Sequence, residues 1–355
     1  MYQASMRRGL TVATLAALAV LSACATPEPE PTPAPPPPPP APPPAVSLNQ
    51  DVAQAASIYV AFMREASSIQ AGFPSAESIQ AALRKGAAYE PAQLSRGLIA
   101  YGSILALQSP EFVNGVRSFA ADPDQRRTVI NRIIADPAYA ATLPGAEAAA
   151  GLIATTIGAD SAAMRVIADA VEGDAYTIQE RNDPRRRWAV VHIPNRENRL
   201  ESTKTLSAAR MLPSADESAR LFAAANSGSG LNASGGRLPP PFTPAMVNSL
   251  AIAALAALGA GGDEYRANTE ALTVESNSEF CLNMSKLMLF QCLAASRPSY
   301  EDMFCVGRHV ARDLSQCTAQ ALAPTGSPQV SLAAAPPIAA DAAVASQNAV
   351  QSGPN

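Results

Sequence analysis

The sequence predicts an all-α protein, a multi-helix domain with a C-terminal disulfide-stapled antiparallel helical hairpin. Three observations support this fold class. Apolar residues recur with the period of a helix from position 51 onward, capping signals precede several of these segments, and four cysteines near the C-terminus have spacings that suit two bridges. The chain is 48% hydrophobic but only 5% aromatic, so its core must be built mainly from Ala, Leu, Ile and Val.

The N-terminus has the ordered parts of a removable export signal. The arginines at 7–8 form a positive region, and residues 10–20 form an apolar core too short to span a bilayer. Leu21-Ser22-Ala23-Cys24 follows. This tetrapeptide resembles the lipobox of bacterial lipoproteins, which implies cleavage before Cys24 and lipidation of its thiol. Because residue 25 is Ala and not Asp, the resemblance also implies the outer membrane and a periplasm-facing domain. The alternative is an ordinary secretory signal that contains a Cys.

The segment that follows the signal predicts an extended spacer. Residues 27–44 hold 13 of the 32 prolines, and such a run cannot form a helix or sheet. A polyproline II helix of this length spans roughly 55 Å at ~3.1 Å per residue. The predicted parts of the chain are the signal peptide 1–23, the lipidated Cys and Pro-rich tether 24–46, a helical domain 47–237, a helical region with the four-Cys hairpin 244–322, and a disordered tail 323–355.

Amphipathic segments with clear start signals fill the first half of the domain. Pro91 stands at a favoured first helical position, and Asp122–Pro123 and Asp136–Pro137 each place a capping side chain before a fixed φ. The alanine-rich stretch 146–180 is also expected to be helical. The segment 187–194, with the only Trp, should be a short strand or an ordered crossing between helices. The apolar stripe of the first helix consists of Val52, Ala55, Ala56, Tyr59, Phe62, Met63, Ala66 and Ile69.

One strongly apolar segment, Met246–Ala260, predicts a buried central helix. Fifteen residues of helix are about 22 Å long, short of the ~30 Å hydrocarbon core of a bilayer. Asn248 and Ser249 shorten the apolar part further.

The four remaining cysteines predict two disulfides in one hairpin. Helices are expected over 275–295 and 299–320, separated by Pro298. Facing residues of an antiparallel pair have a nearly constant index sum, and only the pairing Cys281–Cys317 with Cys292–Cys305 gives matching sums, 598 and 597. The geometry is similar to the twin-cysteine hairpins of the mitochondrial intermembrane space, although those have shorter spacers. The side chains expected in the seam or against the rest of the protein are Leu287, Met288, Phe304 and Val310.

A basic cluster is the first candidate for binding chemistry. Arg185, Arg186 and Arg187 lie in a run of six arginines that also includes Trp188 and His192. The functional interpretation is an anion site for phosphate groups of lipopolysaccharide or for an acidic glycan. The alternative is a solvated surface whose charge is balanced by nearby acids.

Glu275 is the one candidate for catalysis. The segment Val-Glu-Ser-Asn-Ser-Glu-Phe around it faintly resembles the Glu-Ser element of lytic transglycosylases, in which the Glu is the general acid. The Gly-Leu-Met-Gln element of that family is missing, which puts this role in doubt. The alternative is an exposed Glu near a helix start.

The sequence favours a structural or interaction protein of the cell envelope. It would be bound to the membrane by its lipid, with peptidoglycan or another envelope protein as a possible partner. Loss of the signal changes the net charge from −4 to −6, which speaks against nucleic acid. No metal site and no cofactor are predicted, since no close Cys pair exists. The alternatives are a peptidoglycan-modifying enzyme, which needs a cleft with convergent carboxylates, and a carrier of an apolar ligand, which needs a large apolar pocket. An interaction protein needs an exposed apolar patch instead.

Overall fold

A computed structural model describes residues 42–180 and 184–322 of the chain. Within these residues the regular structure is helical, and the only β pairings are two isolated bridges, Leu48 with Gly261 and His192 with Pro298. The predicted fold class is therefore confirmed. The α-helices are α2 (Gln50–Ala66), α3 (Ala76–Ala87), α4 (Pro91–Ala106), α5 (Pro110–Arg117), α6 (Pro123–Ala135), α7 (Ala146–Glu180), α8 (Arg196–Ala208), α9 (Ala215–Ser227), α10 (Pro244–Ala257), α11 (Arg266–Leu272), α12 (Ser276–Ala295), α13 (Ser299–Val306) and α14 (Asp313–Leu322).

Short tighter or wider turns complete the chain. They are the 3₁₀ segments η1 (Ser118–Ala120), η2 (Pro137–Thr142), η3 (Pro184–Val190) and η4 (Asp263–Tyr265), and the π-helical segment η5 (Gly307–Arg312). The predicted caps are present: Pro91 begins α4, and Asp122 and Asp136 each accept hydrogen bonds from the next turn. The crossing that holds Trp188 is the 3₁₀ segment η3, and its ring packs partly against the core.

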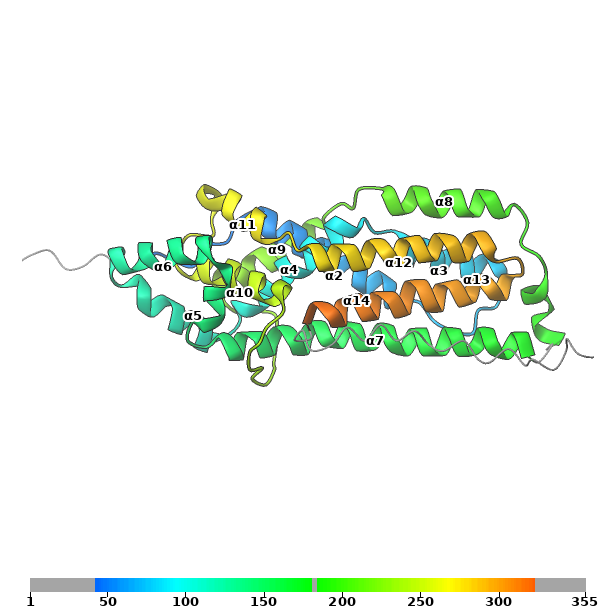
Figure 1. Ribbon diagram of the computed structural model, residues 1–355, viewed down its shortest axis with the longest axis horizontal. Coiled ribbons are helices and arrows are strands. Elements are labelled where there is room, and N and C mark those ends of the chain that lie inside the picture. Colours follow the sequence, from blue (N-terminus) through cyan, green and yellow to red (C-terminus); the bar gives the residue numbers. More distant parts are fainter. Residues whose placement is uncertain (1–41, 181–183, 323–355) are drawn as a thin grey trace, which may run out of the picture. The chain divides into compact units, whose positions relative to one another are not determined.

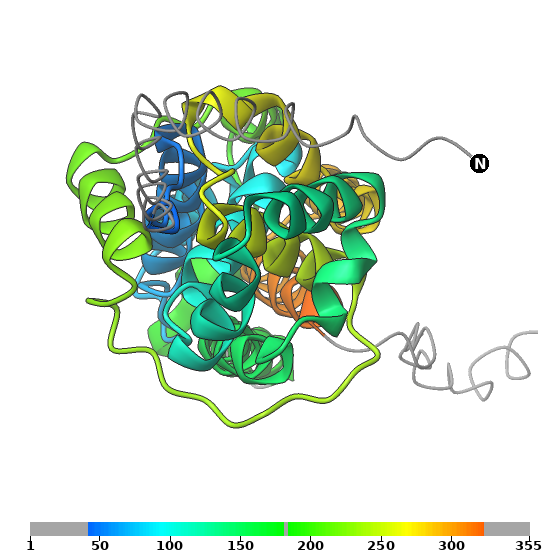
Figure 2. The same ribbon diagram turned by 90° about the vertical axis from the view of Figure 1, so that its left-hand side faces the viewer.

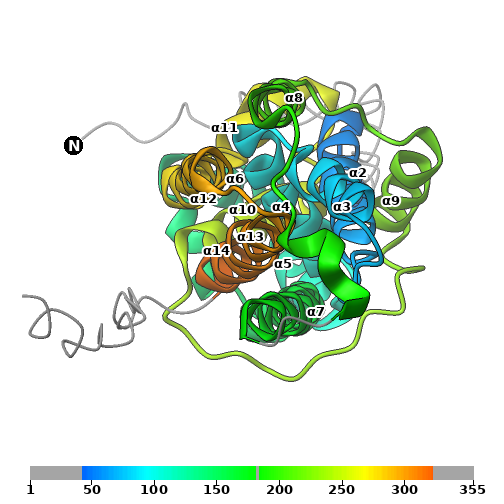
Figure 3. The ribbon, with the colours of Figure 1, turned by 90° about the vertical axis from the view of Figure 1, so that its right-hand side faces the viewer.

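Helices α4 and α10 form the centre of the bundle. In the end-on view α4 is surrounded by α2, α7, α12 and the hairpin helices (Figure 3). Eleven of the fourteen residues of α10 are buried, which confirms the predicted central helix. The two helices can approach closely because small residues meet between them: a Cβ on Gly102 would lie 2.5 Å from Ser249 Oγ. Helices from both predicted regions, 47–237 and 244–322, thus share one core.

The connection between those regions runs around the outside of the bundle. It leaves α9 at Gly228 and returns to α10 at Thr243, where the Thr243 side chain caps the helix (Figure 2). Leu238 N–H donates to Glu147 O on the first turn of α7 at 3.0 Å. Residues 43–49, near the start of the described chain, are tied to the bundle by Asn49, whose Nδ2 donates to Gly261 O at 2.9 Å.

The C-terminal hairpin pairs α12 with the continuous α13–η5–α14 rod, and α7 runs beside that rod (Figure 1). Two disulfides join its arms, Cys281–Cys317 and Cys292–Cys305, with Cα–Cα distances of 5.6 and 5.8 Å. The rod packs tightly on α7 because Gly307 has no side chain: a Cβ there would lie 2.8 Å from Glu172 Cγ. The disulfide-stapled hairpin of the predicted fold class is therefore present.

Candidate functional site

The outer face of α12 carries four of the large apolar side chains that are exposed in the described part of the chain. Phe280 is 66% exposed, Leu287 51%, Met288 41% and Met284 36%. The end-on view places α12 at the outside of the bundle (Figure 3). We expected Leu287 and Met288 to fill the hairpin seam or to pack on the rest of the protein. This prediction is wrong, because both side chains are exposed. The opposite face, with Leu282, Leu289 and Leu293, is buried instead.

The exposed residues of α12 follow alternating three- and four-residue steps. This spacing is that of the a and d positions of a coiled coil, which form a straight seam for a second helix. The six residues on these positions are Asn277, Phe280, Met284, Leu287, Gln291 and Ala294, and all are exposed. We call this row the α12 seam.

No charged side chain is exposed along α12. Its exposed positions are Ser276, Asn277, Phe280, Asn283, Met284, Leu287, Met288, Gln291, Ala294 and Ala295. The two charged residues of the helix lie elsewhere, since Glu279 is half-buried and Lys286 is buried. A surface that faced only water would normally carry charges at such positions. The α12 seam is thus suited to contact with an apolar partner.

Glu275, the candidate general acid, is the N-cap of α12. Its carboxylate accepts hydrogen bonds from the backbone N–H groups of Asn277 and Ser278, both at 2.8 Å, and from Ser278 Oγ at 2.7 Å. The side chain is buried, not exposed. Because these bonds satisfy the free donors at the helix start, the structure gives Glu275 a capping role.

Lys286 is a buried lysine on the inner face of α12. Its Nζ donates to Ala87 O at the end of α3 and to Ser207 Oγ at 3.0 Å, and it lies 3.5 Å from the centre of the Tyr89 ring. Burial lowers the pKa of the Lys286 ammonium well below its usual value, and the charge of Glu90 only partly opposes this. Lys286 joins three helices and does not line the four cavities described below.

Replacing Lys286 by methionine should remove a pH dependence of stability. The unfolded chain keeps the ordinary lysine pKa, so between the folded and unfolded pKa values the unfolded state binds more protons. The free energy of unfolding of the natural chain therefore rises with pH in that window, by about 1.4 kcal/mol for each tenfold difference in proton affinity. Lys286→Met should show no such rise in urea titrations from neutral pH to pH ~10.

The control for this prediction is Lys204→Met, because Lys204 lies on the exposed face of α8. That variant should keep the rise in unfolding free energy. Identical pH profiles for the natural chain and Lys286→Met would show that Lys286 does not have a lowered pKa in the fold.

The structure describes four of the six arginines of the predicted basic cluster, and anion binding there stays a prediction. Arg186 pairs with Asp174 on α7, Arg187 is exposed, and the side chain of Arg185 lies outside the described residues. Farther along, Arg196 donates to Ala294 O at 2.7 Å. Arg186 and Arg196 therefore have separate structural partners.

Arg199 of the same cluster is buried in an ion pair. Its Nη1 lies 2.5 and 2.6 Å from the two carboxylate oxygens of Asp302, and Nη2 donates to Leu293 O. Asp302 also accepts hydrogen bonds from Ser296 Oγ at 2.6 Å and from Gln80 Nε2 at 2.9 Å. This network ties α8 and α3 to the hairpin where it turns. The burial of Arg199 could not be seen in the sequence, where it belongs to a basic cluster that suggested an exposed surface.

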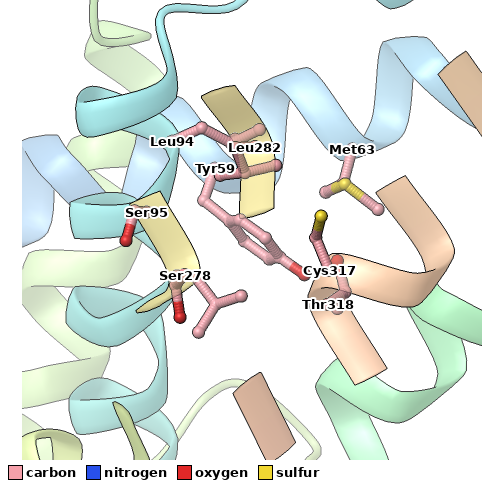
Figure 4. A pocket seen from close by; sticks show the side chains of 9 residues that line it. Tyr59, Met63, Leu94, Ser95, Ser278, Leu282, Cys317 and Thr318 are labelled. Carbon is pink, nitrogen blue, oxygen red and sulfur yellow. The ribbon is translucent and has the colours of Figure 1, made fainter. Parts of the chain in front are cut away.

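The most enclosed of four cavities in the described part of the chain is small. It lies among Tyr59, Met63, Leu282, Cys317 and other residues of α2, α4, α12 and α14 (Figure 4). Its volume is about 10 Å³, the space of a single water molecule. It cannot hold an apolar ligand. A much larger hollow of about 510 Å³ lies between α2, α3 and the segment with Met211 and Leu212, but it is open to solvent.

Three further features concern the lipidation site, metal binding and membrane-spanning helices. Cys24 is outside the described residues. Within residues 42–180 and 184–322, no group of three or more His, Cys, Asp or Glu side chains is arranged to hold a metal ion. None of the helices in that part of the chain has the length and apolar character to cross a membrane.

Comparisons with known proteins give no relative. The chain matches no family model, and no curated protein or solved structure resembles it significantly. The α12 seam therefore has to be interpreted from its own chemistry.

Proposed function

We propose that this chain is a lipid-anchored protein of the bacterial cell envelope that faces the periplasm and binds another envelope protein through the α12 seam. The observation that supports the docking role is a helix face of six exposed, uncharged residues in coiled-coil spacing. The lipobox-like Leu21–Cys24 and the proline-rich tether support the anchored location.

The spacing favours a helix as the partner. A strand would present its side chains with a period of two, which the three- and four-residue steps do not match. A membrane surface is also a poor fit. Helices that lie in the bilayer interface carry Lys and Arg on their polar face, whereas Lys286, the one basic residue of α12, is buried.

The uncharged border of the seam defines the partner's chemistry. In paired helices, charges at the flanking positions select partners of opposite charge. On α12 these flanks carry Ser276, Asn283, Met288 and Ala295, so the face offers no charge to pair. The expected partner is an amphipathic helix with an apolar, uncharged seam. Asn277 and Gln291 of α12 would set the register of the two helices through hydrogen bonds.

The two alternatives, a peptidoglycan-modifying enzyme and a carrier of an apolar ligand, are less well supported. The carboxylate of Glu275 is held by three donors of its own helix. The most enclosed cavity has room only for a water molecule, and the larger hollow between α2 and α3 is open to solvent and bordered by Glu65, Arg84 and Lys85.

Photo-crosslinking from α12 in intact envelopes tests the docking face. With benzoylphenylalanine at position 287, we expect one discrete product in which the partner peptide is a helix with an uncharged three- and four-residue seam. The control places the same group at Val166, which is 69% exposed on α7, and should not give that product. A Cys24→Ala chain should leave the membrane fraction and lose the product.

Other outcomes would contradict separate parts of the proposal. A product between two copies of this chain would assign the seam to self-association, and a product with lipid alone would assign it to the bilayer. Equal products from positions 287 and 166 would show that the seam is not a docking face. A Cys24→Ala chain that stays with the membrane would contradict the lipid anchor.

A further inference from the structure

A notch with three aromatic side chains lies between the end of α7 and α13. Tyr176 comes from α7, and Tyr300 and Phe304 come from α13, one turn apart. The remaining lining residues are Ala175, Gln179 and Glu301. The cavity has a volume of about 180 Å³ and is open to solvent. This is below the ~300–1,000 Å³ of sites for drug-sized ligands, so the notch suits a single small group.

Tyr300 and Phe304 are partly buried against the core, whereas core packing does not explain the third ring, that of Tyr176. Tyr176 is 49% exposed, although the chain contains only 18 aromatic residues and buries most of its large side chains. Tyr176 and Phe304 contact edge to face, with ring centres 5.7 Å apart and planes at 67°. Such a pair holds the rings in fixed positions at the mouth of the notch.

The notch also has a negative group at its edge. Glu301 accepts a hydrogen bond from Arg297 N–H at 2.7 Å through Oε2. Among the side chains that the structure describes, no lysine or arginine forms an ion pair with Glu301. Burial and the nearby Glu301 charge raise the pKa of Tyr300, so its ring keeps a neutral hydroxyl at physiological pH.

We propose that this notch binds a quaternary ammonium group, such as that of choline. The faces of aromatic rings carry negative potential and attract cations, and cages of two or more rings recognise such groups. A quaternary ammonium has no N–H groups that need acceptors, and its methyl groups can contact Tyr176, Tyr300 and Phe304 directly. A primary ammonium would have to give up water for the few polar atoms that line the notch.

Calorimetric titration of the full mature chain with choline tests this site. We expect binding in the millimolar range. The neutral isostere 3,3-dimethylbutan-1-ol has the same shape without the charge and should bind about tenfold more weakly. Tyr176→Leu keeps an apolar side chain but removes a ring, and should weaken choline binding about fivefold. Because Tyr176 is half exposed, this variant should fold normally.

The matched control is Phe222→Leu, since Phe222 is an exposed aromatic residue on α9 that does not line the notch. It should bind choline as the natural chain does. Vesicles of phosphatidylcholine that compete with choline, when phosphatidylethanolamine vesicles do not, would identify a lipid headgroup as the source; failure of both to compete would identify a soluble cation. Equal binding of choline and its isostere, no binding in the millimolar range, or an unaffected Tyr176→Leu chain would overturn the proposal.

Discussion

Replacing Asp302 by alanine should lower the free energy of unfolding by about 3–5 kcal/mol, because it leaves the Arg199 guanidinium buried without its counter-charge. Both side chains of the pair are at most 5% exposed, and Ser296 and Gln80 lose their acceptor as well. Urea unfolding followed by circular dichroism measures the change. The replaced side chain makes no contact with the α12 seam, so the effect should be one of stability.

The double variant Arg199→Met, Asp302→Leu is the control for this prediction. Replacing both members of a buried ion pair with apolar groups of similar size is often neutral or stabilising, so the double variant should recover most of the loss. The exposed pair Lys204–Glu201 on α8 provides a second comparison, and Glu201→Ala should change the stability by less than ~1 kcal/mol. A small loss in Asp302→Ala would show that water reaches the Arg199 site.

Removing the disulfides should produce the second large effect. The Cys281–Cys317 bridge closes a loop with a separation of 36 residues, and Cys292–Cys305 one of 13. The chain-entropy relation assigns them about 3.8 and about 2.9 kcal/mol of stability. The pair Cys281→Ser, Cys317→Ser should therefore unfold at lower urea than the pair Cys292→Ser, Cys305→Ser, and both below the natural chain.

The two bridges are nested, so their effects should not simply add. With the inner bridge intact, the outer one closes a shorter effective loop, so the loss of stability when both bridges are removed should be smaller than the sum of the two separate values. A chain lacking all four cysteines should match the natural chain under reducing conditions. Unchanged unfolding of either double variant would show that its bridge does not restrict the unfolded state.

The helical elements could be predicted because their signals are local. Proline at the first helical position and Asp before proline act within one turn, and α4, α6 and η2 begin where these signals stand. The hairpin was predictable for a different reason. Each of the two helices carries two cysteines. Only one pairing places both pairs opposite each other in an antiparallel hairpin, so the residue numbers alone identify the bridges.

The orientation of α12 could not be predicted from the same pattern. Both of its faces are apolar, with Leu282, Leu289 and Leu293 on one and Phe280 and Leu287 on the other. A helical period shows that a face exists but cannot say which of two equal faces is buried. The coiled-coil spacing of the exposed side was present in the sequence and is the signal that could have identified the seam.

Buried charges were the other feature that the sequence concealed. Arg199 stood in a basic run that suggested a solvated surface, and its partner Asp302 is 103 residues away in the chain. Lys286 likewise depends on Ala87, at a separation of 199 residues. Such pairs are set by tertiary packing, for which neither local spacing nor composition gives a signal.

The two disulfides that hold α12 also affect how it can bind a partner helix. Free helices of this length must lose conformational entropy before they can present an ordered row of side chains, and that loss weakens association. Here Cys281 and Cys292 fix the helix to its neighbour on either side of Met284 and Leu287. The side chains of α12 are therefore already ordered once the disulfides have formed. When a partner helix binds, only the partner loses conformational entropy.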